Sequence, residues 1–390
     1  MFTLRTSRRV CLTTSSECRN HPPRFGQTKL SRDSGKATLT SLVSSGCSSR
    51  ATFTAGSSLN KTFSPPRSND SPRPSTTSES IENTSARWVS RPVFRLGLVG
   101  AGRMGQTHLA AISTSTKVAV TAIVEPRAEV AASLSAQGLV TYESTDALVA
   151  AGGVDGFLVA TPSAFHVDAV RRLASSGLPI LCEKPAGLSV SEASEIQRIV
   201  GDSQSRLQIG YWRRFVPSLR NLKARIDAGT FGRLLVIHAS QWDHRPPAPE
   251  FRNTSGGILV DMGVHEVDMI RWISGNDVLS ISANELMSQE SAVVDQDAGV
   301  FTMRLSTETL GFATLGRFYP DNDFVGIEVM GELEHERIDI IAGNAGDDVL
   351  TMALREQAEA FALGGDPYAA TIDDAIAALR AVNTTTEMRR

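Results

Sequence analysis

The sequence is poor in cysteine and has no long apolar run. It contains 4 cysteines in 390 residues, and Cys11, Cys18 and Cys47 lie in the first quarter of the chain. Cys182 is therefore alone in the remainder, where it can form neither an internal disulfide nor a cysteine-based metal site. This usage is typical of a reducing compartment. No window approaches roughly eighteen apolar residues, so the sequence predicts no transmembrane helix and no membrane partner.

Acidic residues are scarce before residue 92. Residues 1–91 carry fourteen Arg and Lys side chains and five acidic ones, a net charge of +9, whereas residues 92–390 have a net charge of −12. The first segment is rich in Ser, Thr and Pro and lacks the apolar surface that would offset the entropy of ordering, so we expect a disordered tail. The acidic remainder argues against nucleic acid as the main partner.

Two interpretations of this tail are open. An Arg-rich, Ser-rich and acid-poor segment is typical of an organelle transit peptide, which would direct the protein to a mitochondrion or plastid. Ser7-Arg8-Arg9 resembles a twin-arginine signal, but Thr13 to Phe25 are polar and supply no apolar region, so we do not expect secretion. The alternative is a gene model that starts too far upstream, in which case the expected location is the cytoplasm.

A glycine-rich turn after a short apolar run is the first sign of chemistry. Gly100-x-Gly102-x-x-Gly105 follows the segment that begins at Arg95. Gly100 suits a tight turn, Gly102 lets the backbone approach a pyrophosphate, and Gly105 allows a helix to pack closely on a strand. The phosphates would lie at the N-terminus of the next helix, where free N–H groups favour anions. The loop's predicted dinucleotide contacts are Gly100, Gly102, Arg103, Met104 and Gly105.

A carboxylate at the expected distance supports this interpretation. Lys117 to Val124 is a β-branched run suited to a buried parallel strand, and it ends at Glu125, twenty positions past Gly105. A carboxylate there is the expected acceptor for the adenosine ribose hydroxyls, and it would repel a 2′-phosphate, which favours NAD over NADP. Arg127 could instead pair with such a phosphate, which moderates the preference.

The periodicity of the chain changes near residue 230. From Val93 to about Arg214, apolar strands alternate with amphipathic helices, which predicts a parallel sheet covered on both faces. The strands expected there are Phe94–Val99, Val118–Val124, Gly156–Ala160, Ile180–Glu183 and Leu207–Ile209, with helices at Ala164–Ser175 and Val190–Ile199. Beyond Gly232 a largely antiparallel sheet is predicted from Leu234–Ser240, Val278–Met287, Ala298–Ser306, Leu310–Phe318, Gly326–Met330 and His335–Ala342.

We therefore divide the chain into four parts. They are the tail at 1–91, a dinucleotide-binding domain at 92–214, a second α/β domain at 215–370, and a C-terminal helix within 371–390. That helix, Thr371–Thr385, has apolar residues at helical spacing and is expected to return to the first domain.

Polar residues follow two of the predicted parallel strands. Pro162 ends the ladder after one strand and biases Thr161 to an extended conformation, so that Thr161, Pro162 and His166 would line the cofactor crevice. An ordinary turn with a surface histidine is the alternative. Lys184 stands between Glu183 and a proline at the next strand end, and a lysine there could stabilise an alkoxide or exchange its proton. Its alternative is an exposed strand-end lysine.

A third group of residues comes from the second half of the chain. Asp261 and His265 are four residues apart in an expected helix and would share one face. A histidine oriented by a carboxylate is a common general base near neutral pH. Three alternatives are a helix cap at Asp261, a core histidine, or a metal-binding pair; no third ligand is apparent in the sequence, so we expect no metal.

Taken together, these motifs resemble those of the Gfo/Idh/MocA oxidoreductases. They occur in the same order, and the resemblance spans roughly Phe94 to Arg390. Within that family, Gly210–Phe215 and Phe251–Gly257 look most like inositol 2-dehydrogenases. One departure is the short connection between Ile341 and a helix near Val349, where inositol dehydrogenases have a longer segment that helps to wall the pocket.

The resemblance implies an α/β fold: an N-terminal Rossmann dinucleotide-binding domain and a C-terminal α/β domain with a large, open, mainly antiparallel sheet. The second domain would bind substrate, and its sheet commonly builds homodimers or homotetramers. The implied catalytic set is Lys184, Asp261 and His265, which with Arg213 would also contact the substrate. The implied dinucleotide contacts are Gly100, Gly102, Gly105, Glu125, Thr161, Pro162, His166 and Glu183.

The expected function is an NAD-dependent dehydrogenase that oxidises a secondary hydroxyl of a cyclic polyol or sugar, with myo-inositol and 2-keto-inositol as the first pair to consider. In this hypothesis His265 takes the hydroxyl proton with help from Asp261, while Lys184 stabilises the oxyanion. One alternative is an NADP-dependent sugar or carbonyl reductase, or a dihydrodiol-type dehydrogenase. Another is a dinucleotide-sensing regulator without catalysis, although Lys184 and His265 are both present.

Overall fold

The computed structural model describes residues 32–33, 36–37, 92–290, 293–343 and 346–387, and divides into two units, residues 1–85 and 86–390. In the first unit the described residues form a short antiparallel pair, β1 (Arg32–Asp33) and β2 (Lys36–Ala37). The expectation of a disordered tail otherwise lies outside the described residues. Among the helices that are described, none has both the length and the apolar character that crossing a membrane requires.

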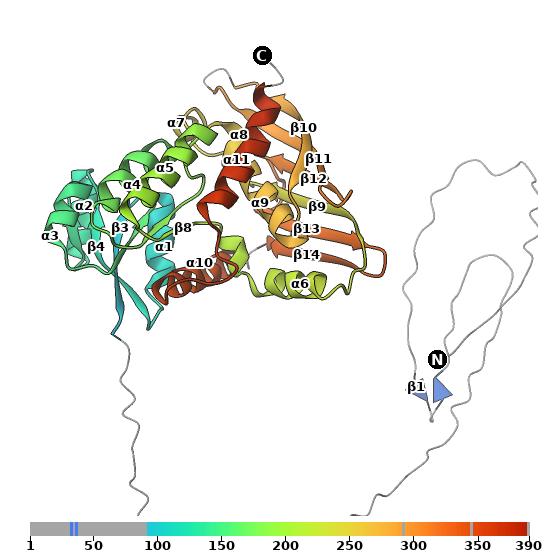
Figure 1. The fold of residues 1–390 in the computed structure, drawn as a ribbon, viewed down its shortest axis with the longest axis horizontal. Coiled ribbons are helices and arrows are strands. Elements are labelled where there is room, and N and C mark those ends of the chain that lie inside the picture. Colours follow the sequence, from blue (N-terminus) through green and yellow to red (C-terminus); the bar gives the residue numbers. More distant parts are fainter. Residues whose placement is uncertain (1–31, 34–35, 38–91, 291–292, 344–345, 388–390) are drawn as a thin grey trace, which may run out of the picture. The chain divides into compact units, whose positions relative to one another are not determined.

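The second unit begins with a six-stranded parallel sheet in the order β5-β4-β3-β6-β7-β8. In Figure 1 this sheet, in which β3, β4 and β8 are labelled, lies among helices α1 to α5. Its strands are β3 (Phe94–Val99), β4 (Val118–Val124), β5 (Val140–Tyr142), β6 (Gly156–Val159), β7 (Ile180–Cys182) and β8 (Leu207–Ile209). Five were predicted to within one residue. The edge strand β5 was not, because none of its three residues is buried and its sequence therefore lacks the apolar run of a core strand.

Helices follow these strands and cover the sheet. They are α1 (Arg103–Ile112), α2 (Ala128–Ala136), α3 (Thr145–Ala151), the 3₁₀ turn η1 (Ser163–Phe165), α4 (His166–Ala174) and α5 (Val190–Ser203). Ser144 and Ser189 start α3 and α5 by accepting a backbone N–H of the first turn, at 3.2 Å in each case. The predicted helix at 164–175 begins as the 3₁₀ turn and becomes α-helical at His166.

The second sheet is largely antiparallel, as predicted. It has the order β10-β11-β12-β9-β13-β14, and only β9 and β12 run parallel. The strands are β9 (Leu234–Trp242), β10 (Val278–Met287), β11 (Gln296–Leu305), β12 (Leu310–Gly316), β13 (Phe324–Gly331) and β14 (His335–Ile341). This sheet, together with the parallel one, confirms the predicted fold class.

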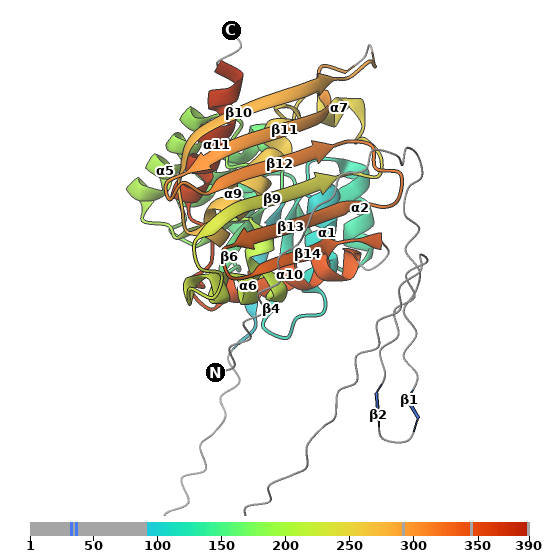
Figure 2. The same cartoon turned by 90° about the vertical axis from the view of Figure 1, so that its right-hand side faces the viewer.

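Helices cover one face of the second sheet. The elements before, between and after its strands are η2 (Trp212–Phe215), α6 (Pro217–Asp227), α7 (Pro249–Arg252), α8 (Gly257–Asp261), α9 (Gly263–Ser274), α10 (Gly346–Ala362) and α11 (Ile372–Glu387). In Figure 2 the sheet lies in front of them. Along β11, Phe301 and Met303 are buried while Val300 and Thr302 are exposed, so one side faces the core and the other is open.

The two C-terminal helices return to the first sheet. α10 packs on α1 and begins at Gly346, slightly before the predicted start near Val349. α11 contacts α5 and β8 as well as α9, and Ala370 accepts a 2.9 Å hydrogen bond from Ile209 N at the end of β8. These contacts tie both sheets into one unit, in which the end of β7 meets the junction of α8 and α9.

Candidate functional site

The glycine loop makes a tight turn and leaves open space at the start of α1. Gly100 has φ of +96°, which favours glycine, and a Cβ on Gly105 would lie 2.1 Å from the Gly100 carbonyl oxygen. A Cβ on Gly102 would meet no protein atom within 4 Å, so the space beside it is open. α1 begins directly after Gly102 without a side-chain cap, which leaves its first N–H groups, at Arg103 and Met104, for an anion.

Glu125 lies at the end of β4, 3% exposed, and its carboxylate already has partners. It accepts hydrogen bonds from the Arg127 side chain at 2.7 and 2.8 Å, from Arg127 N at 2.9 Å and from Ala101 N at 3.1 Å. The Arg127 hydrogen bonds lower the pKa of Glu125, against the effect of its burial. The carboxylate therefore stays ionised beside the glycine loop.

His166 joins the two strand ends rather than pointing into open space. Its ring nitrogens lie 2.8 Å from the Pro185 carbonyl oxygen and 2.9 Å from that of Thr161. The side chain is 1% exposed, and burial lowers its pKa, although the two carbonyl contacts oppose this. His166 thus fixes the loop of Thr161 and Pro162 against the loop that follows β7. The Thr161 hydroxyl is buried and has no hydrogen-bond partner among the described residues.

Glu183 is buried beneath this loop. Its carboxylate lies 2.6 Å from Nε2 of His108 on α1, and it accepts the Lys184 N–H at 3.2 Å. A Cβ on Gly210 would come within 3.0 Å of Glu183, so the fit around it is tight. Glu183 is therefore enclosed by residues of α1 and of the loops after β7 and β8. Its contact with the dinucleotide stays a prediction.

Lys184 and Asp261 meet at the centre of the candidate site. Lys184 Nζ donates to the Asp261 backbone oxygen at 2.9 Å and lies 3.2 Å from Asp261 Oδ1. Burial by itself raises the pKa of Asp261, but the charges of Lys184 and Arg317 outweigh it and lower the pKa overall. An ammonium has three N–H donors, so one of them has no partner among the described residues.

The expectation that one continuous helix carries both Asp261 and His265 is wrong. α8 ends at Asp261 and α9 begins at Gly263, with Met262 between them and a 2.9 Å hydrogen bond from His265 N to the Met262 oxygen. The i,i+4 relationship requires a continuous helix, which this turn interrupts. The Asp261 carboxylate bonds Lys184 and Arg317, so its described partners do not include the His265 ring.

His265 has a buried, largely apolar environment. Its ring packs edge-on against Tyr211 at 5.7 Å and Trp212 at 6.5 Å between centroids, and its buried Nδ1 has no hydrogen-bond partner among the described residues. Burial, followed by the charges of Lys184 and Arg213, lowers the pKa of His265 well below its ordinary value. The imidazole is therefore neutral at pH 7 and can accept a proton.

Arg213 is held inside the protein by two side chains. Its guanidinium donates to Glu266 at 2.6 Å and to Gln241 at 2.7 Å, and the residue is 2% exposed. Its predicted contact with substrate stays a prediction. In this structure the Arg213 charge acts on His265, whose pKa it helps to lower.

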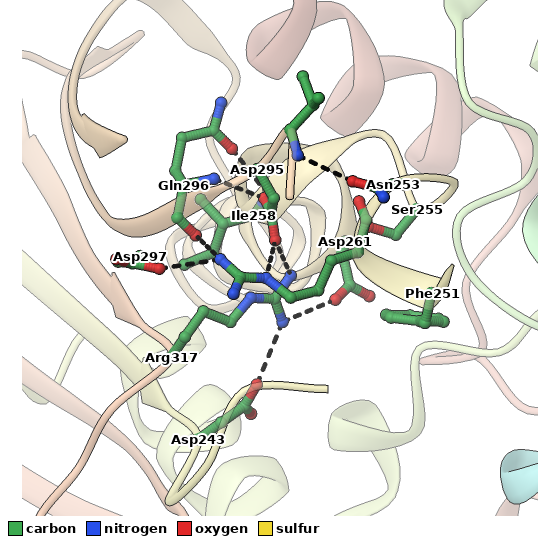
Figure 3. Close-up of polar contacts among 12 residues, drawn as sticks. Asp243, Phe251, Asn253, Ser255, Ile258, Asp261, Asp295, Gln296, Asp297 and Arg317 are labelled. Carbon is green, nitrogen blue, oxygen red and sulfur yellow. Dashed lines mark hydrogen bonds and ion pairs between the residues drawn. The ribbon is translucent and has the colours of Figure 1, made fainter. Parts of the chain in front are cut away.

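A partly buried group of charged residues, not expected from the sequence, lies beside Asp261. Figure 3 shows Arg317 between Asp243, Asp261 and Asp295. Arg317 Nη1 donates to Asp261 at 3.0 Å and to Asp243 at 3.1 Å, and its Nη2 lies 3.4 Å from Asp295. These residues come from four separate segments of the chain, so spacing along the sequence carries no signal for them.

The fold and the glycine loop together define a dinucleotide-binding oxidoreductase. Residues 94–211 match the family described as the oxidoreductase family with an NAD-binding Rossmann fold, and residues 219–334 match the GFO/IDH/MocA C-terminal domain. The chain belongs to the Gfo/Idh/MocA family of oxidoreductases. It is an NAD(P)-dependent oxidoreductase, and NAD is the cofactor of its Rossmann fold.

Several relatives match nearly their whole length. The rhizopine catabolism protein MocA of Rhizobium meliloti is 42% identical over 76% of this chain and 95% of its own. The myo-inositol dehydrogenase Hyg17 of Streptomyces leeuwenhoekii is 33% identical over 73% of this chain and 94% of its own. A crystal structure of a myo-inositol dehydrogenase from Corynebacterium glutamicum superposes with a TM-score of 0.69 at 25% identity, covering 76% and 96% of the two chains.

Proposed function

We propose that this protein oxidises a secondary CH–OH group of a cyclic polyol, with myo-inositol as the first candidate substrate and 2-keto-inositol as its product. The observation that carries the proposal is the Lys184 ammonium, which lies after β7 and is held by Asp261 at 2.9 and 3.2 Å with one N–H to spare. Relatives named as inositol dehydrogenases support the substrate class.

The dinucleotide would be held by the loops after β3, β4 and β6. Gly102 and the first N–H groups of α1 receive the pyrophosphate, and Glu125 receives the adenosine ribose. Bound NAD supplies the hydride acceptor. Further contacts carried over from the family resemblance are Gly100, Arg103, Met104, Gly105, Thr161, Pro162, His166 and Glu183.

The roles of the catalytic residues follow from their environments. Lys184 donates its free N–H to the reacting oxygen and stabilises negative charge as the O–H proton leaves. Neutral His265 accepts that proton, directly or through a water. Asp261 acts through Lys184, whose position it fixes, rather than through His265. For Arg213 we propose a contact with the substrate, which is carried over from the family resemblance.

We further propose a homodimer or homotetramer built on the open face of the second sheet. Val300 and Leu310 expose apolar side chains there, at 39% and 54%, and Phe312 stacks on His238 with centroids 4.0 Å apart. The proposed location is the cytoplasm, with a mitochondrion or plastid as the alternative if residues 1–91 act as a transit peptide. Fluorescent fusions with and without residues 1–91 distinguish these locations.

The deciding experiment is a substrate panel with purified full-length protein and NAD. Oxidation of inositol stereoisomers, aldoses and simple alcohols is followed by NADH absorbance. The proposal expects turnover of at least one inositol with a higher kcat/KM than any open-chain alcohol. Turnover of carbonyl compounds with NADPH alone, or NADH binding without any turnover, would contradict it.

A further inference from the structure

We infer that Arg317 is a positioning residue that orients the Asp261 carboxylate and, through it, the Lys184 ammonium. The inference rests on the function proposed above for Lys184. Arg317 follows β12 and is 1% exposed. Its Nη1 donates to Asp261 Oδ2 at 3.0 Å, while Lys184 Nζ lies 3.2 Å from Oδ1 of the same carboxylate. Each carboxylate oxygen therefore has its own cation, which fixes the plane of the group.

Asp295 holds Arg317 and the helix that carries Asp261. Its Oδ1 accepts the Ile258 N–H at 2.8 Å, in the first turn of α8, and its Oδ2 lies 3.4 Å from Arg317 Nη2. Asp261 is the last residue of the same short helix. The buried Asp295 therefore holds the first turn of α8 and also the Arg317 guanidinium, which bonds Asp261 at the last residue of α8 (Figure 3). This arrangement serves the geometry of Asp261 as well as local stability.

The charges around Asp261 show why Arg317 matters for its ionisation. Among the described residues, the cations that contact Asp261 are Lys184 and Arg317. Asp243 and Asp295 bond Arg317 rather than Asp261, although the charges of Asp243 and Asp261 also act on each other. His265 lies beyond the turn between α8 and α9. Burial raises the pKa of Asp261, and the two cations reverse that effect. Without Arg317, one cation remains on a buried carboxylate and two further aspartates lose a partner.

Arg252 is a matched control that separates the loss of a buried arginine from the loss of the contact with Asp261. It is also 1% exposed, and it donates to Asp295 at 2.9 Å and to Asp297 at 2.9 Å. Its described hydrogen bonds do not reach Asp261. Substituting either arginine removes a buried cation from Asp295, but only substitution of Arg317 removes a contact from Asp261.

The test compares Arg317→Met, Arg317→Lys and Arg252→Met in the full-length protein. Melting curves and NADH fluorescence titrations first establish that each variant folds and binds the dinucleotide. Protein labelled with ¹³Cγ-aspartate then reports the titration of Asp261, assigned by its loss in Asp261→Asn. We expect Arg317→Met to raise the Asp261 midpoint by roughly 1–3 pH units, and Arg317→Lys to restore part of the shift. Arg252→Met leaves it unchanged.

Kinetics with the best polyol form the second arm. We expect Arg317→Met to lower kcat by about 100-fold, with the KM for NAD unchanged, because a misplaced catalytic group costs about that much. Arg252→Met should keep a kcat close to wild type. Equal Asp261 midpoints in the two methionine variants would overturn the inference, even if the wild type oxidised no polyol. If Arg317→Met fails to fold, Arg317→Lys decides, since it too should raise the midpoint above wild type.

Discussion

The Arg127 side chain donates hydrogen bonds to both carboxylate oxygens of Glu125, the residue that the family resemblance assigns to the cofactor ribose. Glu125 receives four hydrogen bonds, three of them from Arg127 at 2.7, 2.8 and 2.9 Å and one from Ala101 N at 3.1 Å. A carboxylate has about four acceptor sites, so a ribose can bind there only by displacing a donor. The exposed guanidinium of Arg127 is the donor with the most freedom to move.

Cofactor preference should therefore depend on both residues. Glu125→Ser removes the acceptor and frees Arg127 to pair with a 2′-phosphate, so the ratio of kcat/KM for NADP over NAD should rise about 10–100-fold, the range expected for one charged hydrogen bond. The double variant Glu125→Ser/Arg127→Ala is the control, and it should lose most of this gain. A Glu125→Ser enzyme with wild-type preference for NAD would contradict the proposed ribose contact.

Loss of either proposed catalytic side chain should reduce turnover without loss of cofactor binding. We expect Lys184→Met and His265→Ala each to lower kcat by about 10²–10⁴-fold, the range of a single general acid–base group. NADH titration monitors the dinucleotide site and should give the wild-type Kd. If both variants kept a near-normal kcat at saturating polyol, the assignment of Lys184 and His265 would be wrong.

Two glycines of the same loop should respond differently to alanine. A Cβ at Gly105 would lie 2.1 Å from a backbone oxygen, so Gly105→Ala should lower the melting temperature or prevent folding. Gly102 has φ of −71° and open space beside it, so Gly102→Ala should fold normally. Its methyl group fills the proposed pyrophosphate space, and the KM for NAD should rise at least tenfold, about 1.4 kcal/mol. A Gly102→Ala protein with unchanged KM would contradict that placement.

The pH profile of kcat/KM should have its acid limb well below pH 6.5. Burial and the charges of Lys184 and Arg213 lower the pKa of His265, and Lys184 and Arg317 lower that of Asp261 despite its burial. Both groups are active when deprotonated, so activity is present above their lowered pKa values and lost as the pH falls through them. Initial rates between pH 4 and 8 test this expectation, with circular dichroism to exclude acid unfolding. A limb centred at His265's ordinary value, near 6.5, would be inconsistent with it.

The open sheet face should carry the assembly. The double variant Val300→Glu/Leu310→Glu places two charges on exposed apolar positions of adjacent strands, and it should shift the protein to monomer in sedimentation experiments. Leu333→Glu is the control, because Leu333 is 73% exposed in the turn between β13 and β14. An unchanged oligomer in the double variant would place the interface elsewhere.

Much of the fold was predictable because its elements have strong local patterns. β3 and β4 are mainly apolar, β10 was predicted at its observed bounds, and the parallel-to-antiparallel change near residue 230 was correct. β5 was missed because its residues are exposed or half-buried and show no core pattern, unlike the equally short edge strand β8. The break at Met262 was missed because apolar residues on both sides continue a helical pattern.

By itself, the sequence determined the glycine loop, the lysine after β7 and the family to which they belong, since each motif consists of residues close together in the chain and the motifs need only occur in order. The three glycine roles follow from steric rules that hold locally. Tertiary structure alone decided the partners of the polar groups. Asp261 bonds Lys184 and Arg317, His108 bonds Glu183, and Arg213 bonds Glu266. These contacts join residues 53 to 77 positions apart, and a pattern read along the chain has no access to such distances.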